Sequence, residues 1–298
     1  MRYFLLFITT IVYLLIAFFY PNAFKIVTYD VSKLFINVII PSIIPMYIIT
    51  SLLVNNKFFI KISNLILKPL SKFESYDSAS ILISSILVGN PTSTIITINK
   101  YCKGEITLSD TKILLSTSFI NPLFIISSFK LIGVTNILSI LFLISLLISN
   151  LILLILSPNK NLINRNNYHS FSIFETLNNL PNILLNIFIM TLFVGYLKIP
   201  LYLKTNFDAL LCIPFEFIEI TTGINNISNY NINTNSKIII CSLLLSSTGL
   251  SIILQSINFI KQKVSDKIRH FTILIFVNRL KIMILTNLIF LFFLKLFF

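Results

Sequence analysis

The sequence predicts an all-α membrane protein built from two repeats, each containing a re-entrant helical hairpin. Three observations lead to this fold class. Of the 298 residues, 56% are hydrophobic and only 11% are charged, whereas about 25% of the residues in a soluble domain are charged. Several apolar stretches approach the ~20 residues that a helix needs to cross a bilayer. Two of them carry helix breakers and hydroxyl side chains at their centres instead of at their ends.

The charge balance favours a lipid partner. The chain has 23 lysine and arginine residues against 10 acidic residues, which gives a net charge of +13. In a soluble protein this excess would indicate nucleic-acid binding. Here the lysines mostly cluster between apolar segments, where they contact anionic headgroups and set the orientation of the chain. We therefore expect the lipid bilayer as a partner, a multi-pass location in the cell membrane, and no nucleic acid.

Residues that usually carry metal or redox chemistry are sparse. The cysteines, Cys102, Cys212 and Cys241, have no metal-ligand spacing, and the two histidines, His169 and His270, lie far apart in the sequence. We therefore expect no metal and no cofactor. The chain also lacks a phosphate-binding glycine loop and the common nucleophile and metalloprotease motifs. It is not expected to be an enzyme.

The first predicted unit, residues 1–31, is an N-terminal transmembrane helix followed by a loop. The apolar stretch 3–19 follows Arg2, and no small-x-small cleavage site precedes Tyr20. A retained helix is therefore favoured over a cleaved signal.

The first repeat is predicted over residues 32–157. Its opening span is followed by residues 57–77, in which lysines alternate with apolar residues. That pattern is typical of a helix lying in the membrane interface; the alternative is a short loop followed by the start of another span. The repeat is expected to end in a long transmembrane helix over about 133–156.

The first hairpin is predicted over residues 78–99. The apolar run is broken at its centre by Gly89-Asn90-Pro91, and each arm of about ten residues gives roughly 15 Å of helix. That length is half the hydrocarbon thickness. A polar, bent turn cannot face lipid, but it can line a cavity. We expect the tip of this hairpin near the midplane of the bilayer.

The second half of the chain has the same order of elements. A polar linker over 158–179 precedes a second repeat over 180–298, whose first span, 179–197, resembles 37–54. A second hairpin is predicted over 237–260, which is broken at Ser247-Thr248-Gly249. Two halves of this design are typical of transporter repeats. Chance similarity among isoleucine-rich segments is the alternative.

The two hairpins are expected to bring helix N-termini together around one polar site. Helix N-termini carry partial positive charge and bind anions, so a small anionic or polar planar ligand is favoured. Asn121 precedes a proline within a span, and Gln255 lies on the same helical face as Ser251. A packing kink and an interhelical hydrogen bond, respectively, are the alternatives for Asn121 and Gln255. The predicted substrate-binding residues are Asn90, Thr92, Ser93, Thr94, Asn121, Ser251, Gln255 and Arg279.

Two charged residues in apolar segments have competing interpretations. An arginine inside a membrane is costly, and the Arg279 guanidinium fits a substrate carboxylate; the alternative is an interfacial, snorkelling arginine. Glu219 would form an ion pair with Arg279, bind a coupling proton or sodium ion, or cap a helix. Glu216 is a competing partner for Arg279. The residues predicted to serve ion coupling or structure are Glu219, Thr221, Thr222 and Thr248.

An ordered set of short motifs resembles a known family. The motifs are GNPTST (89–94), GEITLSDTKILLSTSFINPLFII (104–126), EITTGI (219–224), TGLSIILQ (248–255) and NRLKIMIL (278–285). In this order, they resemble the sporulation integral membrane proteins of the YlbJ (SpoVV) family, in the nucleoside-recognition (Gate) group. Asn90 and Ser93 depart from the aromatic residue and the glycine common in that family, and Asp110 is offset from its acidic position.

This resemblance implies a fold and a function. The fold would be similar to the concentrative nucleoside transporters, with paired hairpins in two inverted repeats. The implied function is import of dipicolinic acid across the outer forespore membrane during sporulation. The alternatives are a nucleoside or nucleobase permease and a non-transporting membrane component of spore-envelope assembly. A homo-oligomer is compatible with each of these.

Overall fold

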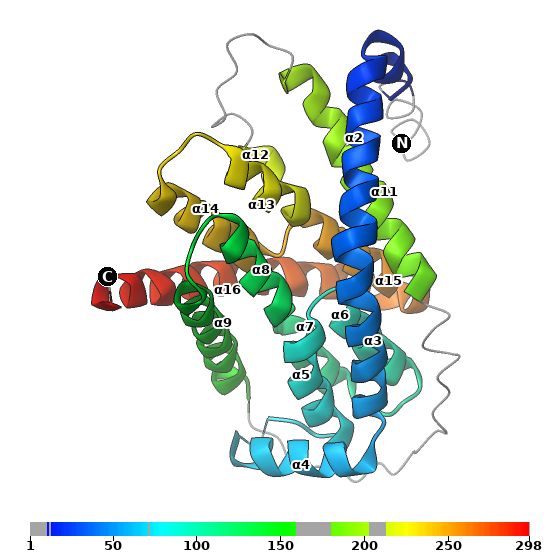
Figure 1. Cartoon of the computed structure of the whole chain (residues 1–298). Helices are drawn as coiled ribbons and strands as arrows, with labels where there is room; N and C mark the ends of the chain where they lie inside the picture. Colours follow the sequence, from blue (N-terminus) through cyan, green and yellow to red (C-terminus); the bar gives the residue numbers. More distant parts are fainter. Residues whose placement is uncertain (1–10, 12, 71, 159–179, 203–212, 298) are drawn as a thin grey trace.

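The computed structural model describes residues 11, 13–70, 72–158, 180–202 and 213–297, and every regular element in them is helical (Figure 1). Most of the predicted N-terminal span and almost all of the 158–179 linker lie outside the described residues. The all-α prediction is confirmed for the described part of the chain.

Several helices are suited to a membrane. Three helical stretches in the described residues are long and apolar enough to cross one: Asn136–Leu156, Thr234–Lys263 and Ser265–Phe297. A fourth span results if Ile43–Val54 and Lys57–Leu70, which are bent by 82° relative to each other, count as one. The length and composition of these helices are compatible with a membrane protein.

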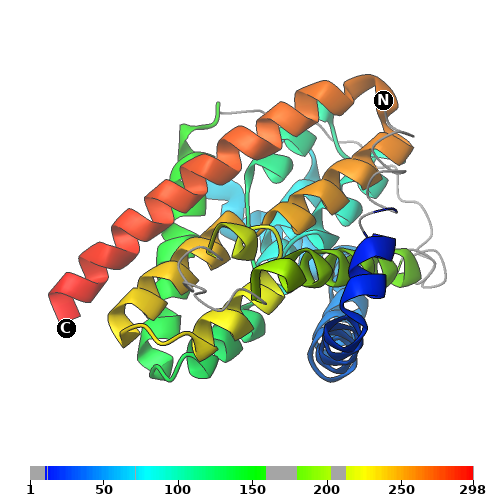
Figure 2. The same cartoon turned by 90° about the horizontal axis from the view of Figure 1, so that it is seen from above.

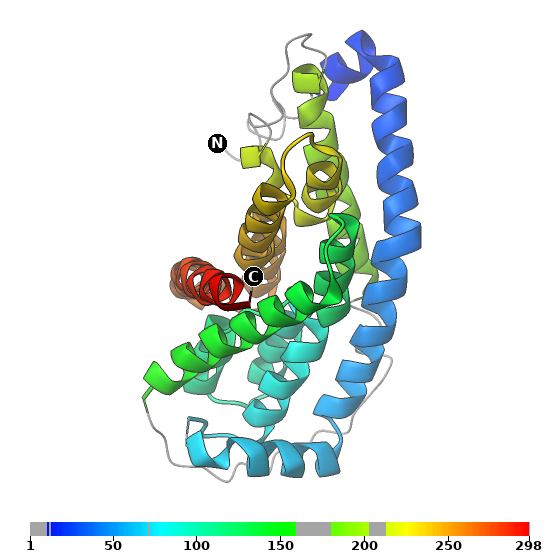
Figure 3. The same cartoon turned by 60° about the vertical axis from the view of Figure 1, so that its left-hand side comes forward.

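One long helix forms an edge of the molecule. Helix α2 (Pro21–Leu34) continues through a π-helical turn (Phe35–Ile39) into α3 (Ile40–Val54), as Figure 3 shows. The loop predicted before residue 32 is therefore wrong. Pro21 occupies the first turn of α2, where its fixed φ angle favours a helix start. Helix α11 (Leu180–Tyr202) packs along α2.

Helix α4 (Lys57–Leu67) lies across the end of α3, as expected for a helix in the membrane interface (Figure 3). Its lysines Lys57 and Lys61 are exposed, whereas Ile60 and Ser63 are buried. Lys72 differs from these lysines, because it is buried and donates a hydrogen bond of 2.8 Å to the carbonyl oxygen of Ile155 near the end of helix α9 (Asn136–Leu156).

The first predicted hairpin is present as a fold-back of two helices. Helix α5 (Tyr76–Val88) and helix α6 (Thr92–Cys102) are joined at residues 89–91. Lys100 Nζ, near the end of α6, lies 3.1 Å from Asp77 Oδ2, near the start of α5. The two helices are therefore antiparallel.

The next helices are also interrupted. Helix α7 (Leu108–Ser116) and helix α8 (Pro122–Leu131) are separated by residues 117–121, which lack helical hydrogen bonds. A proline at the start of α8 helps to fix this break, because proline has no backbone N–H. Helix α9 (Asn136–Leu156) follows.

The prediction of a second hairpin over 237–260 is wrong. Helix α14 (Thr234–Ser247) and helix α15 (Leu250–Lys263) are interrupted at residues 248–249, but they continue as one 30-residue stretch instead of folding back. The reason is packing against helix α16 (Ile268–Phe297), which runs back along both of them (Figure 2). A sequence pattern marks the interruption but does not fix the direction of the chain beyond it.

The chain in this half folds back elsewhere. Helix α12 (Ile213–Glu216) and helix α13 (Ile220–Asn229) precede α14. Lys237 Nζ near the start of α14 donates a 2.7 Å hydrogen bond to the carbonyl oxygen of Ser228 near the end of α13. The two helices are therefore antiparallel, with the turn at residues 230–233.

Candidate functional site

Four helix interruptions meet in two pairs. In the first break pair, residues 89–91 contact residues 117–121, and Asn90 N donates a 3.0 Å hydrogen bond to Phe119 O. Gly89 has a φ angle of 71°, and a Cβ atom at this position would lie 2.7 Å from Asn121 N. Only glycine combines this backbone conformation with so close an approach.

The second break pair joins residues 217–219 to residues 248–251. Leu250 N donates to Phe217 O at 2.9 Å, and Ser251 N donates to Ile218 O at 2.8 Å. The first amides of α15 are therefore already occupied by protein carbonyls. The amides of Leu250 and Ser251 therefore do not contribute to the predicted anion binding at this helix N-terminus, because an anion needs unoccupied amides.

A cavity of about 90 Å³ lies between the two break pairs. Its walls are mostly apolar, and the helix interruptions supply its polar groups. It is far larger than the ~10–15 Å³ that a single water requires. The polar residues that line it are Asn90, Thr92, Asn121, Glu219, Thr221, Ser251 and Gln255.

Several of these polar groups have unused hydrogen-bonding capacity. Among the described residues, Gln255 Oε1 is the cavity-lining side-chain atom that is fully buried without a hydrogen-bond partner. The hydroxyls of Thr92, Thr221 and Ser251, whose residues line the cavity, form no hydrogen bond with another described residue. Thr92 and Ser251 are only 3% and 2% exposed. Buried polar groups are nearly always hydrogen-bonded in folded proteins. Their concentration around one cavity is what a polar ligand requires.

Arg279 lies behind Asn90 instead of in the cavity wall. One terminal atom of the Asn90 carboxamide lies 3.1 Å from Nη1 and 2.6 Å from Nη2 of Arg279. A guanidinium only donates, so this atom is the amide oxygen. The amide nitrogen then donates to Ser93 Oγ at 2.6 Å and to Thr94 Oγ1 at 3.1 Å. Asn90 therefore connects the arginine to the tip of the first hairpin.

The predicted ion pair between Arg279 and Glu219 is absent. Arg279 is 5% exposed, and within the described part of the chain no carboxylate forms an ion pair with it. Glu219 instead caps α13: its Oε1 accepts from Thr221 N at 3.1 Å and its Oε2 accepts from Thr222 N at 2.7 Å. Arg279 is therefore a buried cation that no carboxylate of the described residues contacts.

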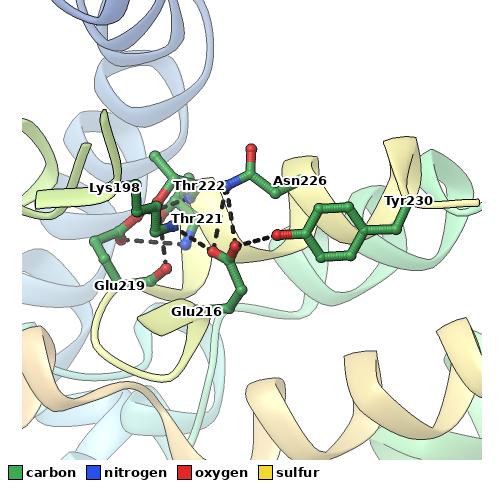
Figure 4. Close-up of polar contacts among 7 residues, drawn as sticks. All are labelled: Lys198, Glu216, Glu219, Thr221, Thr222, Asn226 and Tyr230. Carbon is green, nitrogen blue, oxygen red and sulfur yellow. Dashed lines mark hydrogen bonds and ion pairs between the residues drawn. The ribbon is translucent and has the colours of Figure 1, made fainter. Parts of the chain in front are cut away.

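Glu216, the competing partner predicted for Arg279, belongs to a separate network (Figure 4). It forms an ion pair with Lys198 of α11, and the two residues are 0% and 2% exposed. Tyr230 OH donates to Glu216 Oε1 at 2.6 Å, and Asn226 Nδ2 lies 3.2 Å from the same atom. Lys198 was not identified from the sequence, although a lone lysine inside an apolar helix suggests a buried partner.

The remaining predicted residues occupy different places. Asn121 lines the cavity and its Oδ1 also accepts from Leu123 N at 2.9 Å, so it caps α8. Thr248 has a left-handed conformation with φ 61° where α14 ends. The predicted residues that do not line the cavity are Ser93, Thr94, Arg279, Thr222 and Thr248.

The described residues contain no cluster of three or more histidine, cysteine or acidic side chains that could hold a metal ion. Comparison with known proteins does not assign the chain to a family: no family model, no curated protein and no solved structure matches it.

Proposed function

We propose that this protein is a multipass membrane transporter of a small anionic metabolite, which binds in the cavity between the two break pairs. The observation that carries the proposal is a cavity lined by hydroxyl and amide side chains, with Arg279 bound to Asn90 and contacted by no carboxylate of the described residues. Irregular backbone at membrane depth is tolerated where it lines a cavity. Interrupted helices around a central site are a recurring feature of transporters.

The charge distribution favours a negative ligand at the first break pair. A buried cation without an opposite charge is costly, and a nearby anion offsets that cost. The N-terminus of α6 has no side-chain cap, and Thr92 in its first turn lines the cavity. Its partial positive charge adds to that of Arg279.

Alternating access would follow from two repeats that share one architecture. In our proposal, α5–α6, α7–α8 and α9 correspond to α12–α13, α14–α15 and α16. The segments LLSTS (114–118) and ISNLI (148–152) then align with LLSST (244–248) and LTNLI (285–289). This replaces 237–260 by α12–α13 as the counterpart of the first hairpin.

A contact between aligned residues supports this correspondence. Ser149 and Thr286 occupy the same position in the two aligned segments, and their hydroxyl oxygens are 2.7 Å apart. A residue that lies close to a two-fold axis contacts its own equivalent. We place the axis relating the two inverted repeats between α9 and α16, which pack against each other.

The identity of the anion is the more specific part of the proposal. Dipicolinate is the substrate that the family resemblance implies, with the outer forespore membrane as the location. Its carboxylates suit a site in which Arg279 fixes the Asn90 carboxamide and neutral hydroxyl and amide groups line the cavity.

Uptake by liposomes containing the purified protein tests this function. Dipicolinate should accumulate in liposomes with the wild-type protein, and Arg279→Gln should weaken its apparent affinity by about 10- to 100-fold, as expected for loss of an interaction with a charged group. Arg269→Gln is the matched control, because Arg269 is an exposed arginine of the same helix. Equal uptake by both variants would remove Arg279 from the mechanism.

A nucleoside or nucleobase permease is the second candidate. It is favoured by Gln255 Oε1, a buried acceptor that would pair with an N–H or O–H donor of the ligand. Competition between dipicolinate and nucleosides in the same liposomes separates the two candidates. Absence of uptake for both ligand classes favours the non-transporting membrane component.

A further inference from the structure

Glu219 brings a negative charge to the wall of the proposed anion site. It is 3% exposed and lines the cavity. Its carboxylate accepts only from neutral donors in the described structure: the two amides of Thr221 and Thr222, and Thr222 Oγ1 at 3.0 Å (Figure 4). Among the described residues that line the cavity, it is the only titratable one.

The charged groups around Glu219 are either neutralised or remote. Lys198 on α11 is paired with Glu216. Lys237 lies at the opposite end of α13, and Lys130 lies near the end of α8, eight residues after the first residue of that helix. Lys130 is six residues, roughly 9 Å along α8, from the cavity-lining Phe124. The Ser228 carbonyl that binds Lys237 is seven residues, roughly 10 Å along α13, from the cavity-lining Thr221. Arg279 of α16 is directed at Asn90.

The charges on the two sides of the cavity therefore balance before an anion binds. Ionised Glu219 and Arg279 sum to zero, and a bound anion leaves a net negative charge in a cavity with mostly apolar walls. Two negative charges in a water-poor site repel each other strongly. Protonation of Glu219 removes one of them and leaves the anion opposite Arg279.

We propose that the anion binds together with one proton, which is held on Glu219, so that the transporter moves its substrate with a proton. This inference rests on the proposed function. A protonated Glu219 keeps one oxygen as an acceptor for Thr222 N, so that α13 remains capped. Its O–H group can donate to the bound carboxylate, which a carboxylate on Glu219 could not do.

The dependence of dipicolinate affinity on pH tests the inference. For the wild-type protein in detergent, affinity should fall by up to about tenfold per pH unit as the pH rises, because one proton is linked to binding. Glu219→Gln mimics the protonated side chain and keeps a cap oxygen. It should lose this protein-linked slope, whereas the slope from the ligand's own titration is common to both proteins.

Two further measurements complete the experiment. Asp266→Asn removes an exposed carboxylate outside the cavity and should keep the wild-type slope. In weakly buffered solution with a pH indicator, wild-type protein should take up about one proton per anion bound, which needs no variant to fold. Equal slopes for wild type and Glu219→Gln, or no proton uptake on binding, overturn this inference and leave anion binding intact. If wild type binds no dipicolinate at any pH, the proposed function fails and the inference fails with it.

Discussion

Both break pairs supply hydrogen-bond partners for backbone groups at helix interruptions, but the two pairs differ in the charge of the side chains around them. In the first pair, the carboxamide of Asn150 bonds both the N–H and the C=O of Ser118, at 2.7 and 2.9 Å. In the second pair, the backbone satisfies itself through the bonds of Leu250 and Ser251. An unpaired backbone group is costly in an apolar environment, so each interruption depends on a specific partner.

The charges behind the two break pairs are opposite in sign. Arg279 stands behind the first without a carboxylate partner, whereas two glutamates, Glu216 and Glu219, flank the second. Lys198 neutralises Glu216 and leaves Glu219 at the cavity. The polarity of the site therefore comes mainly from side chains placed around the interruptions, since the amides of Leu250 and Ser251 at the second break pair are already used.

Breaking the ion pair at the second break pair should have the largest effect on stability. Lys198→Met keeps the length of the side chain but leaves the Glu216 carboxylate buried without its cation. We expect a loss of about 3–5 kcal/mol in unfolding free energy, measured by denaturant unfolding in detergent. Lys281→Met, at an exposed lysine of α16, should change stability by less than about 0.5 kcal/mol.

A double variant checks the reason for that loss. Lys198→Met combined with Glu216→Gln removes both charges and should recover much of the stability, because replacement of a whole buried pair is often close to neutral. If the single and double variants are equally unstable, packing around Lys198 would account for the effect and the charge of Glu216 would not.

Replacing the glycine at each break pair by alanine should cost different amounts of unfolding free energy. This difference is smaller than the effect of Lys198→Met. Gly89 and Gly249 both have positive φ angles, of 71° and 68°. A Cβ atom at Gly89 would meet backbone, Asn121 N at 2.7 Å, whereas one at Gly249 would meet the side-chain atom Ile220 Cγ2 at 2.8 Å. Because a side chain can move and this backbone cannot, Gly89→Ala should destabilise by about 1–3 kcal/mol more than Gly249→Ala. The same unfolding assay measures both variants, and equal losses would contradict the close backbone approach at the first break pair.

The positions of three helix interruptions could be predicted from the sequence. Gly89-Asn90-Pro91, Asn121-Pro122 and Ser247-Thr248-Gly249 place breakers inside apolar runs, where each one costs helix stability unless it serves a purpose. The direction of the chain after each interruption depends on distant packing. Helix α16 holds α14 and α15 in line, and no pattern within residues 237–260 indicates that.

The pairing of charges was harder to predict than their positions. The sequence identifies Arg279, Glu216 and Glu219 as charged residues in apolar surroundings, and the first two are buried without contacting each other. Which carboxylate pairs with Lys198 depends on how α11 packs against α13, the helix that also contacts α12. The interruption at 217–219 contains no glycine or proline, so the sequence does not predict a break there. The helix cap that was one of the alternatives for Glu219 is confirmed, because an acidic residue before Thr221 and Thr222 is a helix-start signal.

The smallest loss of unfolding free energy is expected when the helix cap at the second break pair is removed. Glu219→Ala removes the acceptors for the first amides of α13 and should cost about 1 kcal/mol. Asn233→Ala is the matched control, because Asn233 Oδ1 caps α14 by accepting from Ser236 N at 2.8 Å and lies outside the cavity. Unfolding of the two variants in detergent should give similar losses, but only Glu219→Ala should also change ligand affinity. If both variants keep wild-type affinity, Glu219 is a helix cap alone, and the charge contrast between the two break pairs has no part in binding.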